Sequence, residues 1–381
     1  MQFDEQRGLA APNWMNDRFL QEVIRKAKND GSIALCHDCK VRPGGRDGVQ
    51  HASNLFRTTV HYRSKHAPHQ EHATDLIVKM DRGFGSDVQF VKEIRMYREV
   101  LPAMEQVLKT AGGSLSVPRY FYSSNEPRKF IVMEDLFPSG WIQKGEINSI
   151  EDATLCVKAI AKFHAASYIL SKKNHNLVSS CTRMDMDIHK MVSTIGSLAE
   201  MLRARPGSSQ IGVKLHSMKP RFQSKLKQIY NPNNQPHSIS VLNHGELNVT
   251  NLWYRVHPDS EVAMIDFQNC HWGTPAIDLL CLFDLVLDRS LRRAQSDRLV
   301  RVYYEWFMSY LGQTGHMASP FTLQELVKEL RNWAVLELLH LAQRNQLRNS
   351  GPTSVNSIDG ETTDTEIEQD LSELMRRGIF D

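Results

Sequence analysis

Apolar and polar residues alternate in the first third of the chain in a way that predicts strands. From Phe56 to Tyr62, every second residue is apolar or β-branched, which is the period of a strand with one buried face. Three shorter runs of β-branched and aromatic residues predict further strands at 74–80, 117–124 and 128–136. The polar stretch 64–73 is predicted to be a loop between the first two strands.

Five segments show apolar residues at helical spacing: residues 13–30, 90–101, 149–170, 184–205 and 322–346. The second is predicted to close at Pro102, because proline cannot continue the helical hydrogen bonding. Two others open with capping signals, Ser149 three residues before Asp152 and Thr322 three residues before Glu325.

The order of these elements predicts an α+β fold of two lobes. Residues 1–133 form a small mixed lobe with an antiparallel sheet, and residues 134–381 form a larger, mainly helical lobe. A short β element around residues 238–267 interrupts the helices of the second lobe. The acidic, apolar-poor stretch 349–369 is predicted to be mobile.

Composition and charge exclude several classes of protein. Hydrophobic residues make up 41% and charged residues 23% of the 381 residues, so a packed core is expected. The net charge of +3 gives no indication of a nucleic acid or membrane partner, and no apolar run approaches the ~18 residues of a spanning helix. The start lacks the pattern of a secretory signal, so we expect a soluble cytoplasmic protein with six reduced cysteines. The lone C-x-x-C of Cys36 and Cys39 is interpreted as structural, because a zinc site needs a second pair.

A β-hairpin is predicted around the turn 257–260. If Val256 faces Glu261, the numbers of paired residues sum to 517, and Asn251 lies opposite Asp266. Directly opposed side chains have Cβ atoms ~5 Å apart. A carboxamide and a carboxylate oxygen at that distance suit Mg²⁺.

The loop before this hairpin delivers Glu246 to the same end, so three oxygen-bearing side chains are predicted to converge there. The alternative is that Asn251 and Asp266 only cap strand ends and that Glu246 is solvated. Local geometry alone leaves both interpretations open.

Eight segments, in order along nearly the whole chain, match the motifs of one family: PNWMNDRFLQEVI, GVQHASNLFRTTVHYR, LIVKM, FVKEIRMYREVLP, VMEDL, AKFHAAS, HGELNVTNLWY and IDFQNCHWGTPAIDLL. Together they resemble the insect ecdysteroid kinase-like proteins, also called CHK kinase-like. These belong to the aminoglycoside and choline phosphotransferase branch of the protein-kinase-like fold. The resemblance implies that two-lobed fold and an ATP- and Mg²⁺-dependent transfer of phosphate.

The resemblance implies a nucleotide site in the first lobe. Lys79 would neutralise the ATP phosphates while an ion pair to Glu93 holds it in place. The backbone of Glu134 and Leu136 would meet the adenine edge. The glycine turn from Gly48 to Ser53 would cover the phosphates, although a plain hairpin turn is a fair alternative there.

The resemblance also implies roles around the loop HGELNVTN. Asn251 and Asp266 would hold Mg²⁺, and Glu246 would face the acceptor hydroxyl as the catalytic residue. Asp278 resembles an acid that braces this loop. His164 and His244 are interpreted as packing and hydrogen-bonding residues rather than catalysts.

The loop departs from the family pattern at three positions. Glu246 replaces the usual Asp, Asn248 stands where Trp is frequent, and Thr250 replaces the first of two Asn. Glutamate keeps the charge but extends the carboxylate by roughly one C–C bond, ~1.5 Å. Such a displacement can slow a reaction that depends on positioning by ~10²-fold.

Two functions follow from this pattern. The first is an ATP-dependent kinase for a hydroxyl of a small apolar molecule, such as an ecdysteroid or a xenobiotic, slowed by Glu246. The second is a pseudokinase that binds nucleotide or ligand without transfer. Lys79, Glu93, Asn251 and Asp266 are all present, which favours the enzyme. The sequence selects neither the acceptor nor an oligomeric state.

Overall fold

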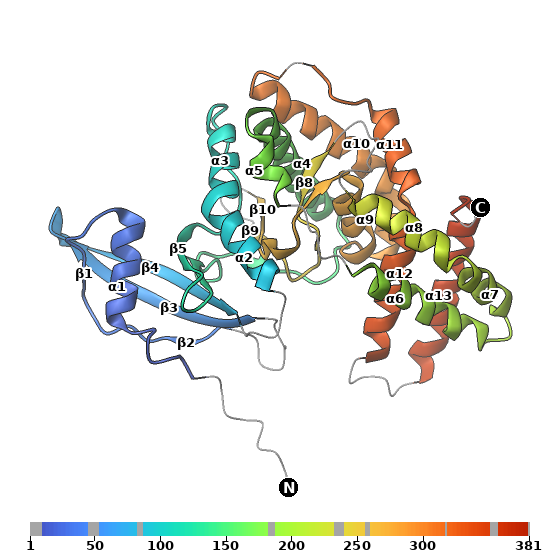
Figure 1. Cartoon of the computed structure of the whole chain (residues 1–381), viewed down its shortest axis with the longest axis horizontal. Coiled ribbons are helices and arrows are strands. Elements are labelled where there is room, and N and C mark those ends of the chain that lie inside the picture. The colour runs from blue at the N-terminus through green and yellow to red at the C-terminus, as the bar shows by residue number, and fades with distance from the viewer. Residues whose placement is uncertain are drawn as a thin grey trace, which may run out of the picture. The chain divides into compact units, whose positions relative to one another are not determined.

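The computed structural model describes residues 10–44, 53–81, 87–181, 187–231, 240–255, 260–316, 318–350 and 357–379. Its contacts divide the chain into two compact units (Figure 1). The first unit comprises Met1–Lys109, Gly113–Gln143 and Leu252–Asn269, and the second comprises Thr110–Gly112, Lys144–Asn251 and Cys270–Asp381. The predicted α+β class is confirmed, with an antiparallel sheet in the first unit and mainly helices in the second. The first unit differs in extent from the predicted lobe 1–133, because it also holds 134–143 and 252–269.

The main sheet of the first unit contains six strands: β1 (Ala34–Leu35), β2 (Arg42–Pro43), β3 (Ser53–Ser64), β4 (Ala67–Asp81), β5 (Tyr120–Ser124) and β6 (Phe130–Glu134). Their order is β1-β3-β4-β6-β5, with β2 also paired to β3, and every pairing is antiparallel. Phe56, Val60 and Tyr62 of β3 are buried, as their alternation predicts.

The prediction of a loop at 64–73 is wrong. Strands β3 and β4 remain paired as far as Ser64 and Ala67, so residues 67–73 extend β4. Most side chains of this extension are exposed, which explains its polar sequence. A strand far from the core has no buried face to reveal it by alternation.

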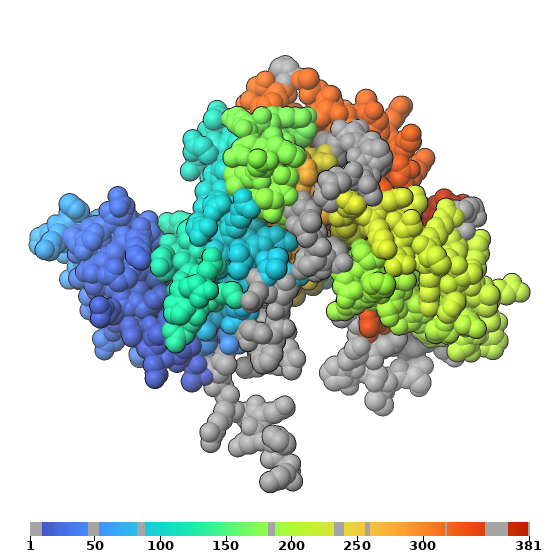
Figure 2. Space-filling model, in the orientation of Figure 1, coloured from blue at the N-terminus to red at the C-terminus, as the bar shows by residue number. Residues whose placement is uncertain are grey.

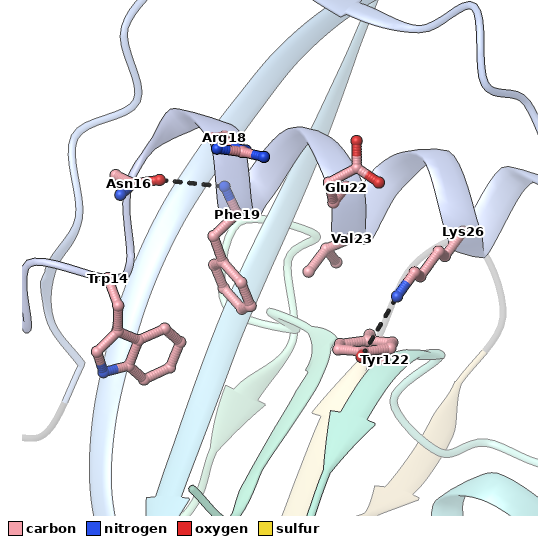
Figure 3. A pocket seen from close by; sticks show the side chains of 8 residues that line it. All are labelled: Trp14, Asn16, Arg18, Phe19, Glu22, Val23, Lys26 and Tyr122. Carbon is pink, nitrogen blue, oxygen red and sulfur yellow. Dashed lines mark hydrogen bonds between the residues drawn. The ribbon is translucent and has the colours of Figure 1, made fainter. Parts of the chain in front are cut away.

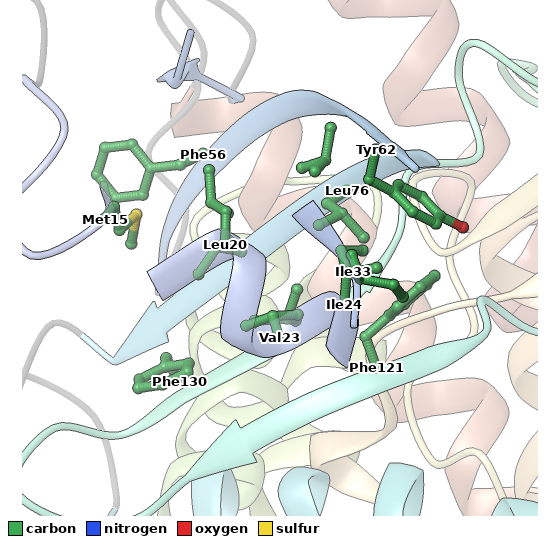
Figure 4. Packing of buried hydrophobic residues seen from close by; sticks show 13 residues of the cluster. Met15, Leu20, Val23, Ile24, Ile33, Phe56, Tyr62, Leu76, Phe121 and Phe130 are labelled. Atoms are coloured by element: carbon green, nitrogen blue, oxygen red, sulfur yellow. The ribbon is translucent and has the colours of Figure 1, made fainter. Parts of the chain in front are cut away.

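Helix α1 (Asp17–Lys28) covers one face of this sheet. The side chain of Asn16 accepts the Phe19 N–H at 3.2 Å and begins the helix, and Asn29 ends it with a left-handed backbone. Figure 4 shows Leu20, Val23 and Ile24 directed at the aromatic and aliphatic side chains of β3–β6. Burying each such residue stabilises the fold by roughly 1.5–3 kcal/mol.

A long helix comes after β4 in the chain and continues through Pro102 without a break. It comprises α2 (Asp87–Arg95), a π-helical turn η1 (Met96–Val100) and α3 (Leu101–Lys109). The prediction that Pro102 closes the helix is therefore wrong. The widened π turn precedes the proline, where a regular helix would suffer the clash of the proline ring with the carbonyl four residues back.

A second sheet of the first unit contains β7 (Ile142–Gln143), β9 (Leu252–Arg255) and β10 (Glu261–Met264), followed by the 3-10 turn η3 (Phe267–Asn269). The predicted hairpin is present, but its register is wrong by one residue. Arg255 pairs with Glu261 and Leu252 with Met264, so paired numbers sum to 516. Five residues connect the pair closest to the turn instead of four, which removes the predicted opposition of Asn251 and Asp266.

The second unit contains ten helices in the described residues and the two-stranded sheet of β8 (Val241–Asn243) and β11 (His271–Gly273). The helices are α4 (Ile150–Lys173), α5 (His175–Ser179), α6 (Ile188–Arg203), α7 (Ser209–Ser217), α8 (Lys219–Tyr230), α9 (Ala276–Leu285), α10 (Arg289–Gln313), α11 (Leu323–Asn332), α12 (Val335–Ser350) and α13 (Ser357–Arg376). Helices α7 and α8 form the yellow-green surface in Figure 2. The caps predicted at Ser149 and Thr322 are both present.

Two predictions in this unit need correction. The segment 322–346 is not one helix, because it breaks at Trp333 and Ala334 between α11 and α12. The stretch 349–369, predicted to be mobile, contributes to helix α13, while its part 351–356 lies outside the described residues. Ile367 and Leu371 of α13, two apolar residues one turn apart, are buried, so this face of the acidic helix packs against the rest of the second unit.

No helix in the described ranges is both long enough and apolar enough to cross a membrane. The six cysteines form no disulfide in the structure.

Candidate active site

Three charged side chains meet in the first unit. The Lys79 Nζ lies 2.6 Å from Glu93 Oε2 and 2.8 Å from Asp266 Oδ1, so the predicted Lys79–Glu93 ion pair is present. Lys79 extends from β4 and is 8% exposed, and Glu93, on α2, is fully buried. Burial by itself would lower the pKa of Lys79, but the adjacent carboxylates of Asp266 and Glu93 outweigh it and raise that pKa. Lys79 is therefore a fixed cation.

The backbone of Asp266 adopts a left-handed conformation, with φ of 68°. This region is uncommon for residues other than glycine and costs about 1–2 kcal/mol. The conformation lies at the end of β10, just before η3, where Phe267 packs edge-on against Tyr97. Strain of this kind gathers at functional sites, and here it accompanies the carboxylate that contacts Lys79.

An apolar cluster of the first unit contains the predicted hinge residue Leu136. Leu136 packs with Trp141, Trp253 and Ala263, and all four are buried. The indole N–H of Trp253 is buried without an acceptor among the described residues. A buried donor of this kind costs free energy until a partner satisfies it. Neither tryptophan was predicted as a site residue, because a single tryptophan gives no chemical signal in the sequence.

The other two predicted nucleotide residues lie at strand ends of the main sheet. Glu134 is the last residue of β6, and its N–H donates to the Arg119 carbonyl at 2.9 Å. Ser53 is the first residue of β3, buried and paired with Asp81. Gly48, which begins the predicted glycine turn, lies outside the described residues.

The loop from Gly245 to Asn251 belongs to the second unit and is held by its own side chains. Gly245 has φ of 81°, a conformation that favours glycine. The Asn251 Nδ2 donates to the Glu246 carbonyl at 2.9 Å, which leaves the Asn251 Oδ1 as the acceptor of that buried side chain. Glu246 itself is partly buried.

Two of the three departures from the family pattern, Asn248 and Thr250, are hydrogen-bonded to each other. The Asn248 Oδ1 accepts the Thr250 hydroxyl at 2.6 Å, the Thr250 N–H at 2.9 Å and the Asn251 N–H at 3.1 Å. This is an Asx-type turn, which short polar residues form readily. Asn248 and Thr250 thus form a local hydrogen-bonded turn that orients Asn251.

The carboxylate of Asp278, on α9, binds the backbone just before Glu246. Its Oδ2 accepts the His244 N–H at 2.7 Å, and its Oδ1 accepts the Gly245 N–H at 2.9 Å. Burial alone would raise the pKa of Asp278, but hydrogen bonds from His164 and the Gly245 amide keep it below its usual range. A buried ionised carboxylate therefore fixes the two residues that precede Glu246.

A shallow pocket of about 340 Å³ lies along α1, lined by aromatic and charged residues that include Trp14, Lys26 and Tyr122 (Figure 3). The Lys26 Nζ lies 4.6 Å from the centre of the Tyr122 ring and 3.4 Å from its hydroxyl. None of the predicted site residues lines this pocket. Across the described ranges, His, Cys, Asp and Glu residues form no group of three that could hold a metal ion. A metal ion bound by the described residues would therefore need amide, water or phosphate oxygens as ligands in addition to carboxylates.

Comparison with solved structures gives similarity at low identity. The chain is similar to an aminoglycoside 2′-phosphotransferase in complex with GDP, with 11% identity, TM-score 0.44, and coverage of 96% of this chain and 100% of that chain. It is similar to the choline kinase LicA from Streptococcus pneumoniae, with 12% identity, TM-score 0.40, and coverage of 94% and 99%. A choline/ethanolamine kinase family protein from Mesorhizobium loti shows 13% identity, TM-score 0.44, and coverage of 84% and 88%.

No curated protein matches the sequence. A model of the ecdysteroid kinase-like family matches residues 47–316, which is more than half of the chain. The matched range begins before the lysine strand β4 and extends beyond Asp278. The chain therefore belongs to the ecdysteroid kinase-like family.

Proposed function

We propose that this protein is an ATP-dependent kinase that transfers the γ-phosphoryl group to a hydroxyl of a small apolar acceptor such as an ecdysteroid or a xenobiotic. The observation that carries the proposal is Lys79, held between Glu93 and Asp266 at 2.6 and 2.8 Å. A buried lysine fixed by a helix carboxylate is the arrangement that neutralises nucleotide phosphates in protein kinases. Family membership supports the same chemistry.

The adenine base is proposed to lie against the apolar cluster of Leu136, Trp141, Trp253 and Ala263. Two features support this position. Aromatic and aliphatic side chains provide the flat apolar surface that a base requires. The buried N–H of Trp253, which has no acceptor in the described part of the chain, can donate to the nucleotide. The backbone of Glu134 and Leu136 is proposed to meet the edge of the base.

Asp266 and Asn251 each carry an oxygen of the kind that Mg²⁺ binds. Asp266 offers a carboxylate, and Asn251 keeps its Oδ1 available because its Nδ2 donates to the Glu246 carbonyl. Mg²⁺ takes one or two such oxygens and completes its coordination with water and phosphate. We propose these two residues as its protein ligands. When bound, the ion would neutralise charge on the phosphates.

Glu246 is proposed to accept the proton of the acceptor hydroxyl. The acceptor oxygen forms a bond to the γ-phosphorus while the bond from that phosphorus to the bridging oxygen of ADP breaks. The hydroxyl proton moves to the Glu246 carboxylate. Asn251 holds the backbone of Glu246, and Asp278 holds the two residues before it. The backbone therefore cannot shift to compensate for the methylene that Glu has and Asp lacks, so only the side-chain conformation of Glu246 can do so. We therefore expect slow turnover.

The substitution at Glu246 also favours one alternative, a pseudokinase that binds nucleotide or ligand without transfer. ATP-dependent thermal stabilisation, with and without Mg²⁺, followed by label transfer to steroid and phenolic acceptors, separates the two. The kinase requires Mg²⁺-dependent stabilisation and labelled product. Stabilisation with no product, unrescued by Glu246→Asp, identifies the pseudokinase. If Mg²⁺–ATP does not stabilise the protein at all, the kinase and the nucleotide-binding pseudokinase are both excluded.

A further inference from the structure

A buried chain of side chains in the second unit extends behind Asp278. The His164 Nε2 lies 3.0 Å from Asp278 Oδ2, and the His164 Nδ1 lies 2.8 Å from the Tyr303 hydroxyl. His164 comes from α4, Asp278 from α9 and Tyr303 from α10, and all three are fully buried. From Tyr303, the chain of contacts reaches the backbone of His244 and Gly245, next to Glu246.

We propose that His164 and Tyr303 are positioning residues for Glu246, acting through Asp278 on the loop. This inference rests on the proposed function for its kinetic consequence. The contact of Asp278 with the loop is what the family resemblance implies. The new element is that a histidine 114 residues before Asp278 fixes the orientation of that carboxylate, and that a tyrosine of a third helix holds the histidine.

The hydrogen bonds define one arrangement of protons. An ionised Asp278 can only accept, so the His164 Nε2 carries a proton and donates it. Burial and the charge of Asp278 raise the pKa of Tyr303 well above its usual value, so the phenol keeps its hydrogen. Its hydroxyl has no other partner in the described parts of the chain, so it donates to His164 Nδ1. Each polar atom of the chain is then satisfied.

Orientation of the carboxylate follows from this arrangement. Oδ2 of Asp278 receives both the His164 N–H and the His244 N–H, while Oδ1 receives only the Gly245 N–H. The imidazole therefore fixes the rotation of the carboxylate about its Cβ–Cγ bond, which sets where the two loop amides bind. Helix α4 also holds strand β8, which leads into the loop, because the Ser167 hydroxyl accepts the Leu242 N–H at 2.9 Å. Two elements thus determine the path of the backbone into Glu246.

Matched substitutions test the role of His164. Glutamine can place its amide nitrogen near the position of Nε2 and keep the donor to Asp278, whereas asparagine reaches only the position of Nδ1 and loses it. We expect His164→Asn to lower kcat about 10- to 100-fold with KM for ATP unchanged, because a shift near 1 Å at the base has that cost. His164→Gln should stay within about three-fold of the wild type under the same argument.

Tyr303→Phe keeps the ring and removes only the hydroxyl, so it should lower kcat less than His164→Asn does. Its matched control is Tyr304→Phe, the same change one residue later, where the hydroxyl contacts the Phe321 carbonyl at 3.4 Å. In a Glu246→Gln background, His164→Asn should have little further effect on kcat, because the group that it positions has already been removed.

Hydrogen exchange at the amides of His244 and Gly245 gives a readout that needs no turnover. These two amides should exchange faster in His164→Asn and Tyr303→Phe than global unfolding explains, and Tyr304→Phe should leave them unchanged. Nitrogen NMR of His164 in the wild type should show a proton on Nε2, the nitrogen that faces Asp278.

The inference fails if His164→Asn and His164→Gln lower kcat equally, or if the two amides keep their protection in both substituted forms. If His164→Asn does not fold, Tyr303→Phe and its control carry the test. A wild-type protein that transfers no phosphate defeats the proposed function instead. In that case the exchange and NMR measurements still decide whether His164 and Tyr303 fix the loop.

Discussion

Replacing Lys79 with methionine should destabilise the protein because it leaves two carboxylates without their shared cation. Lys79 is almost fully buried, Glu93 is fully buried, and the side chain of Asp266 is 27% exposed. Methionine fills a similar volume, so the change removes charge rather than packing. The buried carboxylate of Glu93 is then the dominant cost.

The distances set the scale of this effect. At an effective dielectric constant of about 20, pairs at 2.6 and 2.8 Å each contribute roughly 6 kcal/mol of attraction before desolvation. The desolvation of the ammonium group offsets much of this, and losing one partner of a buried pair costs about 3–5 kcal/mol net. We therefore expect Lys79→Met to lower the free energy of unfolding by about 3 kcal/mol near neutral pH.

The loss should depend on pH in a defined direction. In the wild type, the carboxylates raise the pKa of Lys79, so its stabilisation is fully present below the unfolded value of ~10.4 and lost only as pH rises through the folded value. In the variant, burial without a cation favours the protonated form of Glu93. The folded variant therefore takes up a proton at acidic pH, and the deficit should shrink between about pH 7.5 and about pH 5.

Urea unfolding followed by tryptophan fluorescence at the two pH values measures this. The control is Lys79→Met with Glu93→Gln, which removes the buried charge and should recover most of the stability. A deficit that stays constant with pH, or that the second substitution does not reduce, would refute the reasoning.

Three further results are expected. Asp266→Asn, which tolerates the left-handed backbone, should abolish the Mg²⁺ dependence of ATP binding in calorimetric titrations; unchanged dependence would exclude Asp266 as a ligand. Trp253→Phe should weaken ATP binding about 5-fold, which corresponds to the loss of one hydrogen bond, and should leave the stability of the protein unchanged. If the variant binds ATP with the affinity of the wild type, the indole N–H does not contact the nucleotide. Asp370→Asn should lower the free energy of unfolding by about 3 kcal/mol, because it removes the carboxylate that Arg289, Arg292 and Arg293 of α10 share, whereas Glu373→Gln, whose side chain is 39% exposed, should cost under ~1 kcal/mol.

The sequence predicted the elements whose signal is local. Each of these signals spans only a few residues: the apolar stripe of α1, the alternation of β3, and the caps at Ser149 and Thr322. The structure contains all of them. The Lys79–Glu93 pair was also predicted, but only through the family resemblance. The second partner of Lys79, Asp266, is 187 residues away along the chain, and no local pattern points to that contact.

The failures have physical causes of the same kind. The hairpin register depends on the length of its turn, and one additional residue there shifts every pair. Helix α13 carries a polar sequence, and among its described side chains, 365–376, only one stripe is buried; its Asp370 is held by arginines of a distant helix. Tyr303 resembles any core tyrosine in sequence, since its role depends on His164, 139 residues away. Contacts at such separations arise from the fold and not from spacing.

Transfer of labelled phosphate from Mg²⁺–ATP to a panel of hydroxylated steroids tests the central claim most directly. The wild type should form product slowly, Glu246→Asp should form it faster by about 10-fold or more, and Lys79→Met should form none. The kinase assignment would be contradicted if the wild type and Glu246→Asp both bind Mg²⁺–ATP and neither forms any phosphorylated acceptor.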